Sequence, residues 1–257
     1  MEGRKMMLLV ELYVILISLI LGSFFNVVAI RLLKKESIVF PPSNCPYCKH
    51  KLSVLDLVPV FSYVFLKGKC RYCKTKISPL YPFGELLTAT SIFIVYKFVG
   101  LQLELIPALL LTVLLVISVI TDIRKQLILD VVTLPMLGLL IISRLFIGTE
   151  PFWYYLLGGV VGFALLLLIA IVSRGGMGGG DVKLYAAIGV ALGPWMTVMS
   201  LVLASFVGTF IGVLLMVTGV IKRKQPIAFG PFIFVGTIVA YLFGYDIWNW
   251  YISMLQG

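Results

Sequence analysis

Long apolar runs, separated by short polar or glycine-rich connections, dominate the pattern of this chain. Most of them approach the roughly 20 residues that a helix needs to cross a bilayer. The runs cover residues 8–33, 83–99, 103–120, 131–147, 152–172, 182–192, 195–221 and 229–247. The pattern predicts an all-α polytopic membrane protein with about eight transmembrane helices. The sixth run is the shortest, and Gly193-Pro194 is its expected end.

Composition agrees with a membrane protein. Hydrophobic residues make up 61% of the 257 residues and charged residues 12%, whereas a soluble domain carries about 25% charged residues. The first run is longer than the apolar region of a signal peptide and lacks a small-residue cleavage site, so we expect it to be a true span. The lipid bilayer is therefore an expected partner.

Basic residues concentrate between residues 34 and 82, which contain eight lysines and Arg71. Because Lys and Arg collect on the cytoplasmic side of membrane proteins, we expect this segment to be cytoplasmic. Alternating spans then place the connections near Arg124 and Lys183 on the same side. In such a protein the formal net charge of +10 reports topology, and we expect no nucleic-acid partner.

All four cysteines lie in this basic segment as two C-x2-C pairs, Cys45 with Cys48 and Cys70 with Cys73, separated by 21 residues. This spacing is typical of a four-cysteine zinc site. Disulfides or free thiols are the alternatives, and a reducing cytoplasm argues against disulfides. Four thiolates leave no open position for water, so the expected zinc is structural and folds a cytoplasmic zinc-binding loop domain.

His50 is the only histidine, and it lies beside the first cysteine pair. A serine or cysteine nucleophile would need this residue as its base. Its place in the expected metal loop argues against histidine-based nucleophilic catalysis.

Three aspartates lie near predicted cytoplasmic helix ends: Asp122, Asp130 and Asp181. Asp181 follows a glycine-rich turn, residues 175–180, whose glycines permit close approach to a neighbouring helix or an extended substrate. Two close carboxylates share a proton, and such a pair can hydrolyse a peptide without a metal. Each aspartate could equally cap or end a helix, and a transporter would use the same residues as a relay. The residues alone leave peptidase, transporter and structural functions open.

Several motifs together resemble the bacterial type IV prepilin peptidases, which are GxGD-type aspartyl proteases of the membrane. The motifs occur in the same order as in that family, from about residue 20 to residue 245. They are Gly22-Ser23-Phe24-Phe25-Asn26-Val27 with Arg31, the two cysteine pairs with their flanks, Ile77-Ser78-Pro79-Leu80-Tyr81-Pro82 with Glu85, Gly178-Gly179-Gly180-Asp181, and Phe229-Gly230-Pro231-Phe232. One departure is Leu129, which stands where the family usually has a proline before Asp130.

The resemblance implies that Asp122 and Asp181 are the catalytic pair, supported by Gly178, Gly180, Lys183 and Asp130. It implies cleavage of prepilins or pseudopilins after a short basic leader, at the cytoplasmic face of the bacterial inner membrane. The expected division is a first helix over residues 1–33, a zinc loop with the methyltransferase region over 34–82, and a peptidase domain over 83–257. Bulky replacements at Gly178 or Gly180 are expected to reduce cleavage before they reduce folding.

Family members with the four-cysteine loop are usually also N-methyltransferases that use S-adenosylmethionine. By resemblance alone, the cofactor-binding candidates are Gly22, Ser23, Asn26, Arg31, Gly68 and Glu85. Each candidate also has a simpler interpretation. Gly22, Ser23 and Asn26 could serve helix packing, Arg31 could be an interfacial anchor, Gly68 could form a turn and Glu85 could start a helix. An ion-coupled transporter and a non-catalytic zinc-bearing scaffold of a pilus or secretion machine remain the alternative functions.

Overall fold

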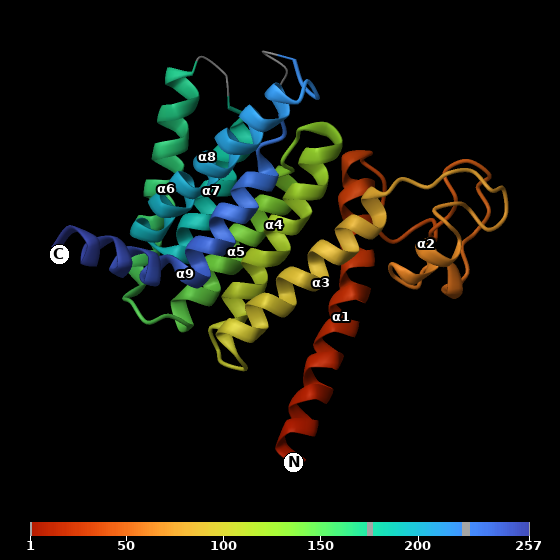
Figure 1. Cartoon of the computed structure of the whole chain (residues 1–257), viewed down its shortest axis with the longest axis horizontal. Helices are drawn as coiled ribbons and strands as arrows, with labels where there is room; N and C mark the ends of the chain where they lie inside the picture. The colour runs from red at the N-terminus through yellow and green to blue at the C-terminus, as the bar shows by residue number, and fades with distance from the viewer. Residues whose placement is uncertain (1, 174–176, 223–226, 257) are drawn as a thin grey trace. The chain divides into compact units, whose positions relative to one another are not determined.

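The computed structural model describes residues 2–173, 177–222 and 227–256 (Figure 1). Within these residues the backbone is helical, with two isolated β-bridges and no strand. The chain divides into two compact units, Met1–Gly100 and Leu101–Gly257. Gly175 and Gly176, which open the predicted glycine-rich turn, lie outside the described residues.

The first unit is built on two helices, α1 (Glu2–Leu33) and α3 (Leu80–Val99), which pack against each other. Small residues allow this close packing, since a Cβ atom on Gly22 would lie 2.9 Å from the Cα atom of Glu85. Asn26 is buried at the same crossing, and its Nδ2 donates a hydrogen bond to the carbonyl oxygen of Tyr81 at 2.9 Å.

Residues 34–79, which we call the cysteine loop, connect these two helices. The loop contains a 3-10 turn, η1 (Val54–Asp56), and one short helix, α2 (Phe61–Phe65). Its only buried residues are Cys45 and Cys70. The loop therefore has no apolar core of its own, as expected for a segment that a metal ion folds.

The second unit is a bundle in which five helices surround a buried central helix. Its helices are α4 (Leu105–Lys125), α5 (Asp130–Phe146), α6 (Phe152–Val172), α7 (Gly179–Leu192), α8 (Pro194–Val217) and α9 (Gly230–Gln256). The central helix is α7, which contacts each of the other five. Leu184, Tyr185 and Ile188 on α7 are fully buried. Apolar packing therefore surrounds the helix whose first turn contains Asp181.

Glycines bring α6 and α7 into backbone contact. A Cβ atom on Gly158 would overlap the carbonyl oxygen of Gly189, and one on Gly189 would overlap the carbonyl oxygen of Gly158. This small-residue contact is typical of membrane helices, where van der Waals packing drives association. The α7 helix has 14 residues, or about 21 Å at 1.5 Å per residue, which is shorter than a hydrocarbon core of about 30 Å.

A buried ion network joins the ends of several helices. Arg144 on α5 is 4% exposed, and its Nη1 lies 2.7 Å from the Oε2 atom of Glu104, the N-cap of α4. Arg144 also donates to the carbonyl oxygen of Ala191 at the end of α7, and Glu104 accepts a 2.6 Å hydrogen bond from the Tyr241 hydroxyl. The network fixes one end of the bundle, at the C-terminus of α7.

The predicted fold class is confirmed: the protein is all-α and multi-pass. Six of the described helices are long and apolar enough to span a membrane, whereas α5 and α7 have only 17 and 14 residues. The predicted break at Gly193-Pro194 is also confirmed, because α7 ends at Leu192 and α8 begins at Pro194. The functional division at residues 33 and 82 stays a prediction; the packing boundary lies at Gly100.

Candidate functional site

Two aspartates that are far apart in sequence come together in the second unit. Asp122 lies in the last turns of α4, and Asp181 lies in the first turn of α7. Their carboxyl groups are close enough to interact electrostatically. Glu104 and Asp122 are separated by 18 residues of α4, or about 27 Å, so the pair lies at the opposite end of this helix from the Arg144 network.

Asp122 is held by the beginning of another helix. Its side chain is buried, and its Oδ2 accepts a 2.6 Å hydrogen bond from the backbone N–H of Gly230, the first residue of α9. Helix N-termini carry partial positive charge and favour anions. A Cβ atom on Gly230 would lie 2.8 Å from Oδ2, so any larger residue there would displace the Asp122 carboxylate. Sequence reasoning placed Gly230 in a motif but missed this role, which the Gly-Pro start of a helix could have indicated.

Asp181 is half-buried, and the glycines before it have different surroundings. The N–H of Gly178, the N-cap of α7, donates to the Oδ2 atom of Asp181 at 3.2 Å. A Cβ atom on Gly180 would lie 2.9 Å from the Cβ atom of Ile128, whereas one on Gly179 would meet no atom within 4 Å. Gly180 therefore allows the start of α7 to lie close to the α4–α5 connection. This close approach is between two parts of the protein.

Lys183 and Asp130 form an ion pair at the starts of two helices. The Nζ atom of Lys183 lies 2.5 Å from the Oδ2 atom of Asp130, and both side chains are about half exposed (42% and 50%). Asp130 is the first residue of α5, with Leu129 as the N-cap, so its interpretation as an N-cap was wrong. The pair joins the start of α5 to the start of α7. Its Lys183 lies two residues after Asp181.

The four cysteines converge on one point of the cysteine loop. The Sγ atoms of Cys45, Cys48, Cys70 and Cys73 all lie within 4.8 Å of one another, and those of Cys45 and Cys73 are 3.8 Å apart. Tetrahedral zinc with Zn–S bonds of about 2.3 Å requires sulfur atoms about 3.8 Å apart. Hydrogen bonds with Thr75 lower the pKa of the Cys73 thiol to about 6. The cluster can hold a metal ion and fits the dimensions of a four-thiolate site.

Asp56 links the second cysteine pair to η1. Its carboxylate accepts hydrogen bonds from Arg71 Nε at 2.6 Å and from the Tyr72 hydroxyl at 3.0 Å. Burial alone would raise the pKa of Asp56, but these bonds and those from Ser53 lower it to about 2. The ring of His50 lies 3.7 Å from that of Tyr72, measured between centroids. His50 therefore packs against a residue of the second cysteine pair, within the cysteine loop.

The six methyltransferase candidates fall into three places within the first unit. Ser23 and Arg31 line a cavity between α1 and the cysteine loop. Gly22, Asn26 and Glu85 lie at the crossing of α1 and α3. Gly68 has a φ of +69° in a turn before Cys70, and a Cβ atom there would lie 2.9 Å from the Tyr63 hydroxyl. Gly68 therefore has a structural role, as does Gly22.

Comparison with known proteins gives a consistent result over both units. Residues 16–99 match the family described as Bacterial Peptidase A24 N-terminal domain, and residues 109–213 match the Type IV leader peptidase family. These ranges fall within the first and the second compact unit, respectively.

Three relatives that carry the name Prepilin leader peptidase/N-methyltransferase are similar over almost the whole chain. The protein of Bacillus subtilis (strain 168) is 38% identical over 240 residues, which are 93% of this chain and 97% of the relative. The protein of Aeromonas salmonicida (strain A449) is 34% identical and covers 94% of each chain. The protein of Pseudomonas aeruginosa is 33% identical, over 93% of this chain and 92% of its own. No solved structure matches.

Proposed function

Because this chain belongs to the type IV leader peptidase family, we propose that it removes the leader peptide of prepilins or pseudopilins with Asp122 and Asp181 as its catalytic pair. The protein is a multi-pass protein of the bacterial inner membrane, and we place the active site at the cytoplasmic face. One observation carries the proposal: Asp122 in the last turns of α4 and Asp181 in the first turn of α7 are near enough to interact electrostatically. Hydrolysis by two carboxylates requires this pairing.

The surroundings of the two carboxyl groups suggest separate roles. Asp122 accepts the short N–H hydrogen bond at the start of α9, which favours its ionised form. We assign Asp122 as the general base that takes a proton from the attacking water. Asp181 accepts a longer bond from Gly178, and the nearby charge of Asp122 favours a protonated partner. We assign Asp181 as the acid that donates its proton to the carbonyl oxygen of the substrate, and then to the leaving amine.

The Lys183–Asp130 ion pair has a supporting role in this proposal. It joins the beginnings of α5 and α7 on the exposed side of the site. Each partner neutralises the other, so Lys183 is not free to act as a strong counter-ion of Asp181. We propose that the pair positions the first turn of α7, and with it the Asp181 carboxyl group.

The cysteine cluster is proposed to hold one structural zinc ion. Its four sulfur atoms have the separations of a closed tetrahedral site, and the cysteine loop has no other buried residue that could fold it. Such an ion takes no part in peptide hydrolysis.

A second activity, N-methylation of the new N-terminal residue of the substrate, is proposed for the first unit. S-adenosylmethionine supplies the methyl group in this chemistry. Ser23 and Arg31 are the candidates that line a cavity large enough for a small molecule, with a volume of about 350 Å³. The carboxylate of Glu85 interacts with Ser23.

The peptidase proposal is tested by cleavage of a prepilin by the purified protein. We expect Asp122→Asn and Asp181→Asn each to lower the cleavage rate by about 10²–10⁴-fold, since each removes a group that transfers a proton. Asp246→Asn is the matched control, because Asp246 is exposed on α9. Undiminished cleavage in either site variant would refute the pair.

A further inference from the structure

Residues 52–66, which we call the apolar segment, form the middle of the cysteine loop. The segment contains η1 and α2, and its only charged residue is Asp56. Lys51 precedes it and Lys67 follows it. Several of its large apolar side chains are exposed: Val54, Leu55, Leu57, Val58, Phe61, Val64 and Phe65. An exposed apolar patch of this kind marks an interaction surface.

The apolar face of α2 points away from the rest of the cysteine loop. Phe61, Val64 and Phe65 are three and four residues apart, so they share one face of the helix, and Phe65 is 81% exposed. Tyr63 faces the loop instead, because its hydroxyl donates to the carbonyl oxygen of Ile77 at 3.3 Å. The helix therefore presents its apolar face outward, which is the reverse of a helix that covers a core in water.

The apolar segment lies beside the middle of α1. The Oε2 atom of Glu85 on α3 accepts the Val60 N–H at 2.7 Å. The Cα atom of Glu85 in turn lies beside Gly22, where an added Cβ atom would approach it to 2.9 Å. Gly22 precedes Arg31 by nine residues of α1, or about 14 Å. Val60 therefore lies at the level of the candidate membrane span Lys5–Leu33, well inside its polar end.

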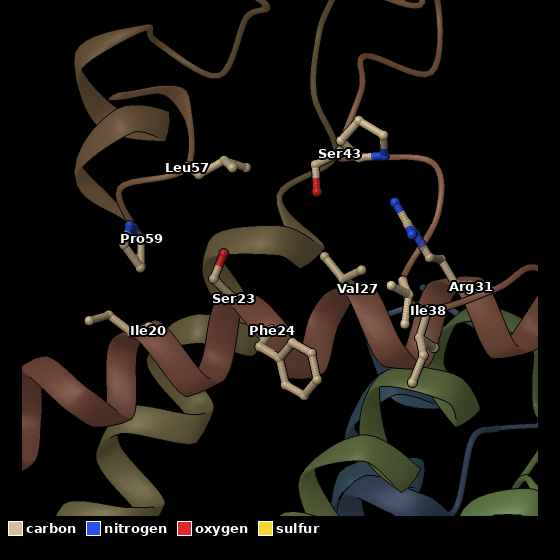
Figure 2. A pocket seen from close by; sticks show the side chains of 11 residues that line it. Ile20, Ser23, Phe24, Val27, Arg31, Ile38, Ser43, Leu57 and Pro59 are labelled. Carbon is tan, nitrogen blue, oxygen red and sulfur yellow. The ribbon is translucent and has the colours of Figure 1, made fainter. Parts of the chain in front are cut away.

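The cavity beside α1 supports the same depth (Figure 2). Leu57 and Pro59 of the apolar segment line it together with Ile20 and Ser23 of α1. Figure 2 shows Leu57 and Pro59 above the part of α1 that contains Ile20 and Ser23, whereas Arg31 lies further along the helix. The cysteine loop thus folds back along the apolar part of α1.

Several polar groups of the apolar segment have partners within the protein, as contact with lipid requires. The side chain of Asp56 is 4% exposed, and its Oδ1 atom lies 2.6 Å from the Nε atom of Arg71. The N–H groups of Ser62, Val64 and Leu66 donate to carbonyl oxygens within the segment. The single acidic group and the backbone of α2 can therefore leave water.

We propose that the apolar segment inserts into the bilayer beside α1, with Phe61, Val64 and Phe65 among the acyl chains of the leaflet at the C-terminal end of α1. Lipid suits this face better than a water-soluble partner does, because the face lies at the depth of a membrane span. Four exposed lysines flank the segment: Lys49, Lys51, Lys67 and Lys69. Lysines in such positions attract anionic lipid headgroups. The inference depends on neither proposed activity.

The test is photo-crosslinking of the full-length protein in nanodiscs of phosphatidylethanolamine and phosphatidylglycerol. The two variants are Phe65→benzoylphenylalanine and, as the matched control, Tyr47→benzoylphenylalanine. Both positions carry exposed aromatic side chains of the cysteine loop, at 81% and 67%, but Tyr47 lies in the first cysteine turn, outside the apolar segment. We expect at least ten times more phospholipid adduct at position 65 than at position 47, attached through an acyl chain. Mass spectrometry measures the yield and the point of attachment.

Thermal unfolding checks that each variant is folded. If the Tm of the Phe65 variant falls, Val64→benzoylphenylalanine replaces it, because Val64 is exposed on the same face of α2. Equal lipid yields at positions 65 and 47 would overturn the proposal, as would adducts confined to the headgroups. Crosslinks from position 65 to a second copy of the chain or to an added prepilin, in place of lipid, would also overturn it and would identify a protein as the occupant of this face.

Discussion

The cysteine loop and the α4–α9 bundle are stabilised in opposite ways. Between residues 34 and 79 the only buried residues are Cys45 and Cys70. In the bundle, nine of the 14 residues of α7 are buried. The loop depends on a few specific bonds, whereas the bundle depends on many apolar contacts that each contribute little. The two regions should therefore respond to different perturbations.

Metal removal should give the largest effect, and only in the loop. Structural zinc contributes about 10–16 kcal/mol to the folding of small metal-bound domains. We expect a strong chelator to accelerate tryptic cleavage within residues 34–79 by at least tenfold, with no change within residues 177–222. Mass spectrometry of the fragments is the measurement, and the same chelator loaded with zinc is the control. A loop that remains protease-resistant without metal would show that its folding does not require the cluster.

Two ion pairs that differ in burial, one in each unit, provide a second test of how the two units are stabilised. The side chain of Arg144 is 3% exposed in its pair with Glu104, whereas the side chain of Lys97 is 46% exposed in its pair with Glu11 in the first unit. Removal of one partner of a buried pair costs about 3 kcal/mol, and an exposed pair contributes about 0–1 kcal/mol. Arg144→Met should therefore lower Tm by roughly 6–12 °C, and Lys97→Met by a few degrees at most. Equal shifts in thermal unfolding would contradict this difference.

Two neighbouring glycines give the smallest and most local test. Gly180→Ala places a Cβ atom against Ile128 and displaces the adjacent Asp181, so we expect cleavage to fall about tenfold. Gly179→Ala meets open space and should stay within twofold of the parent. The rate of prepilin cleavage and the Tm of each variant are measured together. Equal losses of activity would instead indicate that the substrate, and not Ile128, requires the glycines.

Hydropathy predicted those parts of the fold that lipid contact determines. The run over residues 152–172 coincides with α6, and the break at Gly193-Pro194 was found because these residues interrupt a helix locally. The start of α7 at Gly179 was missed, since glycines carry no apolar signal. The short elements η1 and α2 were missed for a similar reason, because they lie in a polar segment with no regular periodicity.

The candidate site was predictable only as far as local motifs extend. The family resemblance selected Asp122 and Asp181, and the cysteine spacing predicted the cluster. The Gly230 hydrogen bond joins residues 108 positions apart, and the Lys183–Asp130 pair joins residues 53 positions apart. Such contacts depend on how the helices pack, which one sequence does not encode as a pattern. The cavity beside α1 escaped prediction because Val60 and Glu85 meet only after the loop folds back on the helix.

The short length of α7 has a consequence for how the protein is made. A segment of 14 residues that contains Asp181 and Lys183 is a poor substrate for independent insertion by the translocon. Its glycine contact with α6 provides a surface on which it can enter the bilayer as the second half of a hairpin. We therefore expect α6 and α7 to leave the ribosome and enter the membrane as one unit. Asp181, the proposed catalytic acid, would then reach its depth in the membrane during biosynthesis because α7 is attached to a hydrophobic neighbour, α6.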